Sequence, residues 1–273
     1  MRTIRLLVLP FLIALAAHCP AQASPPQVTL ADTEQRTISS AKIGQAYDLL
    51  ISLPENYAKS GKAFPVLYVL DGWHFPLMAF LQNNNVHSGR MPPVIIVNIS
   101  QGSAGDVMAL RARDFTPTRT PREATSGGAA AFLDFLEHDV IPFVDRTYRT
   151  IPTDRGLLGH SYGGLFAIYC LVQRPALFQR IVAASPIVDW DNRLLFAAAR
   201  TKLRNLPAHV RLDLSVGGEN DDTDNVVAFA KLLDELKPSG LDYRFTLYPG
   251  QNHNSMRLVS FPAGLYWVYR PEK

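Results

Sequence analysis

The sequence has few cysteines and little net charge. Two of its 273 residues are cysteines, charged residues make up 19% of the chain, and the formal net charge is only +3. A charge this close to zero does not indicate a nucleic-acid or other polyanionic partner. Hydrophobic residues reach 47%, so we expect stability to come from a large buried core rather than from disulfides.

The N-terminus also has no apolar run long enough to cross a bilayer, which takes roughly 20 residues. The run from Leu6 to Ala17 follows Arg2 and Arg5, and residues 21–23 read Ala-Gln-Ala, the small-x-small pattern that signal peptidase recognises. We therefore predict a cleaved signal peptide over residues 1–23 and a periplasmic or secreted protein, with no stable membrane span after cleavage.

Two alternatives for this segment are weaker. Pro10 and the Ala-Gln-Ala site argue against a buried helix or a membrane anchor, and His18 stands where a lipoprotein start at Cys19 would have a small residue. Cleavage would leave a net charge of +1 and Cys170 as the remaining cysteine. Because Cys170 lies in an apolar helical run, we expect a buried small side chain rather than a reactive thiol.

The rest of the chain, residues 24–273, is predicted to be one catalytic domain, because no repeat, low-complexity tract or long linker divides it. Apolar strand-like runs alternate with helical patterns, which is typical of an α/β fold with a mainly parallel sheet and helices on both faces. An N-terminal hairpin is expected over residues 28–39 and 46–54. Further strands are expected at residues 64–72, 92–100, 155–161, 180–186, 210–218 and 242–250, and helices at 129–144, 163–172, 226–236 and 263–270.

Residues 159–163, Gly-His-Ser-Tyr-Gly, fit the G-x-S-x-G pattern between a predicted strand and a predicted helix. A sharp strand-to-helix turn strains the serine backbone, and glycines two residues before and after it avoid collisions. The turn would expose the Ser161 hydroxyl at a helix N-terminus, where backbone N–H groups can stabilise an oxyanion. We predict that Ser161 is a nucleophile rather than part of a tight glycine turn.

A serine hydroxyl needs a base, and in this fold the order along the chain is serine, acid, histidine. Two histidines follow Ser161. His209 precedes a predicted strand and so lies at the wrong end of the sheet, whereas His253 follows the last strand, which Pro249 and Gly250 are expected to end. His253 is therefore the candidate base.

The acid should follow the preceding strand, where residues 215–225 carry several carboxylates. Counting three residues past Gly218 selects Asp221, with Glu219 as the second choice and Asp189 or Asp191 as less favoured ones. The acid would orient His253 and stabilise its charged form. The same segment is similar to an oxygen-rich calcium loop, but it lacks the full EF-hand pattern, so no metal is predicted.

The oxyanion hole needs two donors. Tyr162, the residue after the nucleophile, should supply one backbone N–H, and Gly72 or Trp73, just after the third strand, should supply the other. Asp71 is interpreted as a structural residue.

As a set and in this order, these motifs resemble the esterase-D-like group of α/β-hydrolases. The chain is most similar to predicted bacterial hydrolases that include siderophore esterases of the enterobactin and salmochelin type. The resemblance covers most of the chain from residue 47 onward and rests on segments 65–72, 111–118, 132–150, 155–186, 215–221 and 249–255. It implies the α/β-hydrolase fold, the nucleophile Ser161, the base His253 and the oxyanion donors Gly72 and Tyr162, whereas the position of the acid varies within the group.

The segment Arg-Ala-Arg-Asp-Phe-Thr-Pro-Thr, residues 111–118, lies near the site in relatives. The resemblance implies that Arg113 could contact an anionic or catecholate substrate, and Trp73 is a second candidate contact. The plainer interpretation is that Arg113 and Asp114 pair to fix a loop.

We therefore expect an exported serine esterase that acts on a small-molecule ester without metal or organic cofactor, and siderophore trilactones are the most concrete substrate. Feruloyl or acetyl esters of carbohydrates, acyl transfer, peptide cleavage with the same serine, and a non-catalytic binding role are the alternatives. The sequence does not set the oligomeric state.

Overall fold

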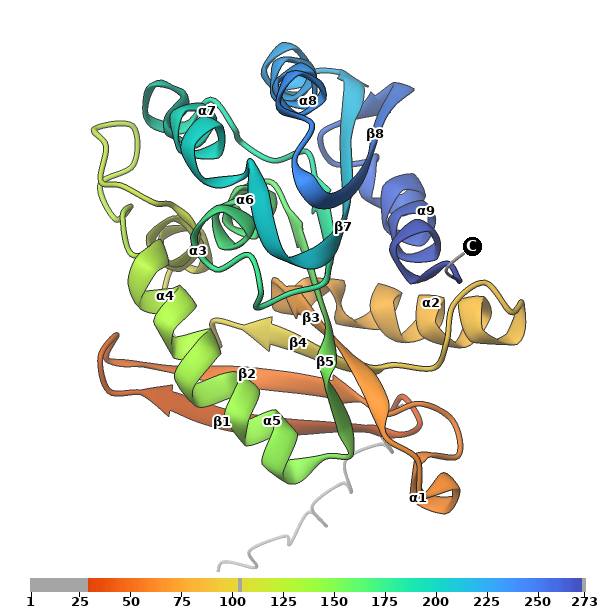
Figure 1. Ribbon diagram of the computed structural model, residues 1–273. Helices are drawn as coiled ribbons and strands as arrows, with labels where there is room; N and C mark the ends of the chain where they lie inside the picture. Colours follow the sequence, from red (N-terminus) through yellow and green to blue (C-terminus); the bar gives the residue numbers. More distant parts are fainter. Residues whose placement is uncertain (1–28, 103–104, 272–273) are drawn as a thin grey trace, which may run out of the picture.

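The computed structural model describes residues 29–102 and 105–271 (Figure 1). The predicted signal peptide, residues 1–23, lies outside the described residues. In chain order the elements are β1 (Thr33–Ser40), β2 (Gln45–Ser52), α1 (Tyr57–Ser60), β3 (Phe64–Leu70), η1 (Gly72–His74), α2 (Phe75–His87), β4 (Ile95–Ser100), α3 (Val107–Phe115), α4 (Ala129–Phe135), the π-helix η2 (Leu136–Val140), α5 (Ile141–Thr147), β5 (Thr150–His160), α6 (Tyr162–Gln173), β6 (Arg180–Ala184), α7 (Trp190–Lys202), β7 (Asn205–Glu219), α8 (Thr223–Leu236), β8 (Ser239–Asn252) and α9 (Arg257–Tyr269).

One eight-stranded sheet has the order β1-β2-β4-β3-β5-β6-β7-β8. β1 and β2 form the antiparallel hairpin that the sequence predicts, and β2 also pairs antiparallel with β4. From β4 to β8 every pairing is parallel. The mainly parallel sheet is therefore confirmed, and the carboxyl ends of β3, β5, β6, β7 and β8 meet along one edge.

Helices cover both faces of the sheet. Successive side chains of a strand point to opposite faces, so each central strand contributes side chains to two buried layers. In β3, Val66, Tyr68 and Leu70 belong to one buried cluster, whereas Leu67 and Val69 belong to another. Side chains of α4 to α8 complete the first cluster, and side chains of α2 and α9 complete the second. Figure 1 shows α2 and α9 on the side of the sheet opposite α4 and α6.

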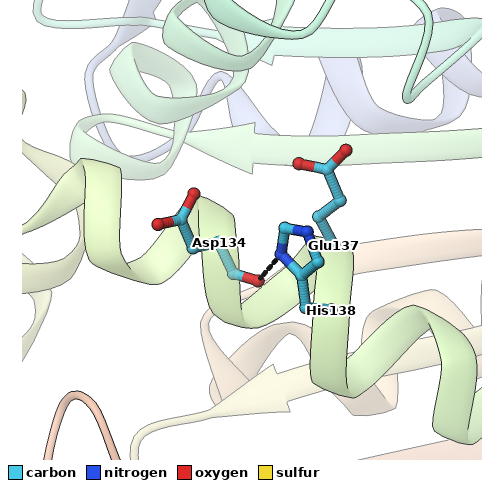
Figure 2. A group of neighbouring side chains, drawn as sticks. All are labelled: Asp134, Glu137 and His138. Carbon is cyan, nitrogen blue, oxygen red and sulfur yellow. Dashed lines mark hydrogen bonds between the residues drawn. The ribbon is translucent and has the colours of Figure 1, made fainter.

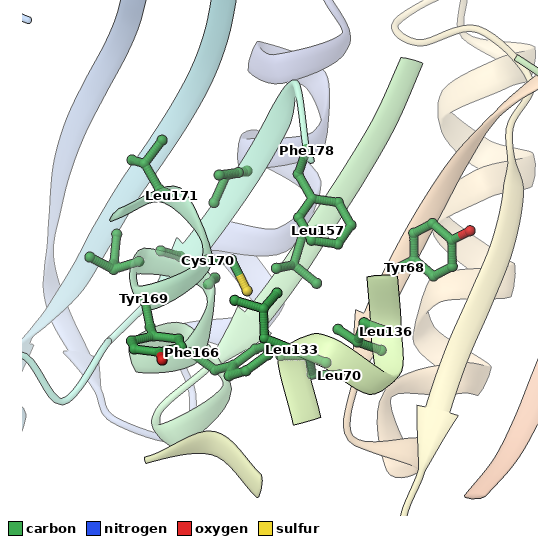
Figure 3. Close-up of a cluster of buried hydrophobic side chains, with 14 of the residues drawn as sticks. Tyr68, Leu70, Leu133, Leu136, Leu157, Phe166, Tyr169, Cys170, Leu171 and Phe178 are labelled. Atoms are coloured by element: carbon green, nitrogen blue, oxygen red, sulfur yellow. The ribbon is translucent and has the colours of Figure 1, made fainter. Parts of the chain in front are cut away.

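Figure 3 shows part of the larger cluster, with the Cys170 side chain of α6 among aliphatic and aromatic neighbours such as Leu133, Leu157 and Phe166. Cys170 has no exposed surface, which confirms its expected burial. Burial raises the pKa of its thiol well above the ordinary value, so the unreactive neutral form is favoured.

Two local expectations need correction. The prediction that Pro249 and Gly250 end the last strand is wrong, because β8 continues to Asn252. The ladder between β7 and β8 shifts register between Gly217 and Glu219, and Gly250 has a φ of 71°, so a bulge takes up the irregular residues. β8 is an edge strand, where a proline without an N–H can be tolerated.

The second correction concerns the helix expected over residues 129–144. The segment is helical, but α4 and α5 are joined by the π-helical turn η2, and the helix extends to Thr147. None of the helices formed by residues 29–102 and 105–271 is long and apolar enough to cross a membrane.

Candidate active site

Ser161 lies in a strained turn between the end of β5 and the start of α6. Its φ of 61° and ψ of −120° are values that residues with a side chain rarely adopt. The turn is held by its neighbours, since Ser161 donates its N–H to the carbonyl of Ala184 at 3.0 Å. Strain of this kind, at a strand end and a helix start, is what the G-x-S-x-G pattern leads one to expect.

Close backbone contacts require two of the three glycines near Ser161, Gly159 and Gly164. A Cβ atom on Gly159 would lie 2.1 Å from the carbonyl oxygen of Gly163, and one on Gly164 would lie 2.9 Å from the carbonyl oxygen of Ala184. A Cβ atom on Gly163 would make only ordinary contacts, the nearest at 3.4 Å to Leu70. The expectation that a side chain at the second glycine of the motif would collide with its neighbours is therefore wrong for Gly163.

Asp221 and His253 are joined directly. His253 donates from Nδ1 to Oδ1 of Asp221 over 2.7 Å, and the carboxylate has no exposed surface. Asp221 also accepts the backbone N–H groups of Gly217, at 2.9 Å, and Asp222, at 2.8 Å, and the hydroxyl of Ser185. Burial alone would raise the pKa of Asp221, but these hydrogen bonds, from His253 and Ser185 first, hold it below its ordinary value.

The other acids considered from the sequence are engaged or placed elsewhere. Asp189 pairs with Arg122, with an N–O distance of 3.1 Å, and Asp191 accepts the Thr118 hydroxyl at 2.6 Å. Glu219 is exposed at the end of β7. Of the carboxylates in the described ranges, Asp221 is the one that hydrogen-bonds His253.

His253 is also held beside the nucleophile turn. The buried ring of His160, the residue before Ser161, donates from Nε2 to the carbonyl of His253 over 2.7 Å, and the two ring centroids are 4.6 Å apart. Burial, followed by the charge of His253, lowers the pKa of His160 well below its ordinary value, so this imidazole is neutral. Within residues 29–102 and 105–271, no hydrogen bond joins the Ser161 hydroxyl to the His253 ring.

The turn after β3 lies at the same edge of the sheet, because β3 pairs in parallel with β5. Gly72 begins the short helix η1, and a Cβ atom on it would lie 2.6 Å from Cβ of Ser100. A Cβ atom on Gly163, in the first turn of α6, would lie 3.5 Å from Oδ2 of Asp71. The segment that carries Gly72 is therefore packed against the start of α6, where Tyr162 lies.

The two predicted substrate contacts differ in their surroundings. Trp73 is 47% exposed in η1, next to Gly72. Arg113 donates from Nε to Asp114 at 2.7 Å and from Nη2 to the Tyr47 hydroxyl at 3.1 Å, which matches the plainer interpretation of a loop-fixing pair. A substrate contact for either residue stays a prediction.

Sequence reasoning missed Arg111, His160 and Ser185. Arg111 forms a buried ion pair with Asp71, and Ser185 follows β6 at the sheet edge and bonds to Asp221. Ser185 could have been found by the rule that ligands and catalytic groups gather after parallel strands. Nothing in the spacing of residues 111–114 indicates which of the two arginines turns toward the site.

A second group that combines carboxylates with a histidine lies on the helical segment of α4 and η2 (Figure 2). In the part of the chain that the structure describes, Asp134, Glu137 and His138 are the group of at least three such residues whose ligand atoms come within 4.8 Å of one another. Lys42 binds Asp134 at 2.6 Å and Arg174 binds Glu137 at 3.0 Å, so cationic side chains already neutralise these carboxylates.

Comparisons with known proteins identify the family of the chain. Residues 40–254 match the Esterase family, described as "Putative esterase". The chain is 28% identical to the ferri-bacillibactin esterase BesA of Bacillus subtilis, over 89% of this chain and 92% of that protein. It is 28% identical to the apo-salmochelin esterase of Escherichia coli, over 80% of this chain and 73% of that protein.

The fold is also that of solved relatives. The crystal structure of the BES protein from Bacillus cereus superposes with a TM-score of 0.81 at 27% identity, covering 92% of this chain and 100% of that one. Because the family match covers well over half of the residues, the chain belongs to the Esterase family, and it is an esterase with the α/β-hydrolase fold.

Proposed function

We propose that the chain is an exported serine hydrolase that cleaves the ester bonds of siderophores, with Ser161 as nucleophile, His253 as general base and Asp221 as the acid of a triad. The observation that carries the proposal is the hydrogen bond from His253 to the buried Asp221 carboxylate, beside the strained Ser161 turn. A buried carboxylate on Nδ1 fixes the tautomer of the imidazole, leaving Nε2 to accept a proton, and stabilises the imidazolium that then forms.

The reaction proceeds in two balanced halves. His253 Nε2 takes the proton of Ser161 as Oγ attacks the ester carbonyl, and the N–H groups of Tyr162 and Gly72 stabilise the oxyanion. His253 then protonates the leaving alcohol, and an acyl-serine remains. Water, activated by the same imidazole, hydrolyses the acyl-serine to the acid. We expect a hydrogen bond between Ser161 Oγ and His253 Nε2 to form when substrate binds, because catalytic hydrogen bonds are often long before substrate binds.

The siderophore substrate is supported by the relatives whose names describe esterases of ferri-bacillibactin and apo-salmochelin. In a cyclic trilactone the leaving alcohol stays attached to the product, so one hydrolysis consumes one water and opens the ring. The predicted signal peptide would bring the catalytic domain, residues 24–273, to the compartment where an imported iron chelate arrives. Feruloyl and acetyl esters are the competing substrates.

The test uses purified residues 24–273 with p-nitrophenyl butyrate and with intact enterobactin and bacillibactin, each iron-free and iron-loaded. The wild type should release linear trimers from the trilactones. Ser161→Ala should lower kcat by a factor on the order of 10⁴ to 10⁶, whereas Ser88→Ala, a serine at the end of α2, should not change it.

Equal rates for wild type and Ser161→Ala would contradict the nucleophile. Turnover of p-nitrophenyl butyrate without any opening of the trilactones would contradict the siderophore substrate and leave the serine mechanism in place.

A further inference from the structure

A buried ion pair joins the two turns that would supply the oxyanion donors. Arg111, in α3, donates from Nε to Oδ1 of Asp71 at 2.6 Å and from Nη2 to Oδ2 at 2.9 Å. The same Nη2 lies 3.5 Å from the carbonyl oxygen of His160. Asp71 directly precedes Gly72, and His160 directly precedes Ser161. One guanidinium therefore contacts both segments.

The pair is shielded from water. The exposed fractions of the Arg111 and Asp71 side chains are 4% and 0%. A bidentate pair between a guanidinium and a carboxylate has a narrow geometry, and low polarity around it strengthens each hydrogen bond. Burial raises the pKa of Asp71, and Arg111 opposes this shift, so the carboxylate depends on its partner to keep its charge.

The backbone of Asp71 is one that needs support. Its φ of 70° and ψ of 106° lie outside the regions that side-chain-bearing residues favour. The direction of the Gly72 N–H follows from the ψ of Asp71, because both atoms of that bond lie in the peptide plane between the two residues. Holding the Asp71 carboxylate in place therefore also holds the direction of the Gly72 N–H.

The guanidinium also packs against the ring of the residue after Gly72 and against the ring of the second donor residue, Tyr162. Its carbon lies 4.9 Å from the ring centroid of Trp73, which follows Gly72, and 5.8 Å from that of Tyr162, which follows Ser161. Such contacts between a cation and an aromatic ring are attractive and are strongest when water is excluded. Arg111 thus contacts residues on both sides of each turn.

We propose that Arg111 is a positioning residue that sets the spacing and direction of the Gly72 and Tyr162 N–H groups through its pair with Asp71. The inference rests on the proposed serine ester hydrolysis. Since the Arg111 side chain is enclosed by protein, it acts on the oxyanion through these two turns rather than by touching the substrate.

The test compares Arg111→Met and Arg111→Lys with a matched control. Arg244→Met breaks another ion pair, in which Arg244 binds the fully buried Asp213 at 2.6 Å, between β7 and β8. For p-nitrophenyl butyrate, Arg111→Met should lower kcat roughly tenfold to a hundredfold with KM changed by less than about threefold, because oxyanion contacts form mainly in the transition state. Arg111→Lys keeps the charge but cannot form the bidentate pair with Asp71, so its kcat should lie between those of the wild type and Arg111→Met.

A second readout separates positioning from loss of folded protein. A thionoester places the developing charge on sulfur, which fits poorly between donors arranged for oxygen, so the wild type should prefer the oxygen ester. Arg111→Met should reduce the ratio of the two kcat values by about tenfold, because misdirected donors no longer favour oxygen. The fraction of folded enzyme cancels in this ratio, and Arg244→Met should leave it unchanged although its melting temperature falls.

An Arg111→Met enzyme with the wild-type ratio would overturn the inference and leave the proposed hydrolysis intact. If Arg111→Met does not fold, Arg111→Lys decides the question. An Arg111→Lys enzyme with the wild-type kcat and the wild-type ratio of oxygen-ester to thionoester kcat would equally overturn the inference. A wild type that cleaves no ester at all would overturn the proposed function, and this inference with it.

Discussion

In the part of the chain that the structure describes, the histidine–carboxylate group at Asp221 and the one at Asp134 differ in burial and in what the histidine binds. At the edge of the sheet, His253 donates from Nδ1 to the fully buried carboxylate of Asp221 over 2.7 Å. On the helical segment of α4 and η2, His138 instead binds the backbone carbonyl of Asp134 at 2.9 Å, and both side chains are in contact with solvent.

The difference shows that placement, rather than residue type, makes an imidazole a candidate base. Near Asp134 the lowering of the carboxyl pKa comes first from the hydrogen bond of Lys42, and water screens the exposed charges. At Asp221, burial is opposed by a converging set of donors, so the carboxylate is both charged and fixed in place. A fixed, charged carboxylate is what orients an imidazole for proton transfer.

The largest expected contrast is between the two histidines. His253→Ala should lower kcat for an ester by a factor on the order of 10⁴ to 10⁶, because the serine loses its base. His138→Ala should leave kcat unchanged. Steady-state kinetics of both variants measure this contrast, with circular dichroism to check folding. Similar losses of kcat in the two variants would contradict the role of His253 as the base.

The next contrast is between the two carboxylates. Asp221→Asn should lower kcat about 10³- to 10⁴-fold at unchanged fold, since the amide can no longer hold the required tautomer and charge of His253. Asp134→Asn should have no effect on kcat. Full activity of Asp221→Asn would mean that the chain works with a serine–histidine pair alone, and Glu219→Gln would then be the next variant to measure.

The smallest expected effect concerns Ser185, whose hydroxyl is one of the donors to Asp221. Ser185→Ala should raise the pKa of Asp221 and lower kcat by about threefold to thirtyfold, because only part of the about 1.5 to 3 kcal/mol that a hydrogen bond to a charged group contributes acts on the transition state. Ser88→Ala is the matched control, and a kcat equal to that of the control would contradict the role of Ser185.

Ser185→Ala also predicts a change in pH dependence. The pKa of Asp221 is depressed in the fold, so its stabilisation is present above the ordinary carboxyl pKa and is lost as the pH falls through the depressed value. The variant should therefore lose less stability than the wild type between about pH 5 and about pH 3. Urea unfolding at both pH values tests this, and equal losses in the two proteins would count against it.

The sheet was predictable because the buried parts of its central strands are short apolar runs bounded by turn residues. The order of strand ends along the chain sufficed to select Ser161, Asp221 and His253 as candidates. The full length of β8 could not be predicted, because Pro249 and Gly250 normally interrupt strands and only the edge position of β8 tolerates them. The π-helical turn between α4 and α5 likewise leaves the apolar pattern almost unchanged.

The contacts of Arg111 were not predictable either. Arg111 and Arg113 lie two residues apart on one helix and so face different directions, and only the packing of α3 decides that Arg111 meets Asp71 while Arg113 meets Asp114. Pairings across 40 residues of sequence, as between Asp71 and Arg111, depend on tertiary structure that local patterns do not contain.

The most direct test of the central claim is the site of covalent labelling by a fluorophosphonate that reacts with activated serines, read by mass spectrometry of the intact chain and of its peptides. The structure leads us to expect a single adduct on Ser161, formed rapidly by the wild type and by His138→Ala but not by His253→Ala. An adduct on another serine, or labelling of Ser161 that does not depend on His253, would contradict the proposed site.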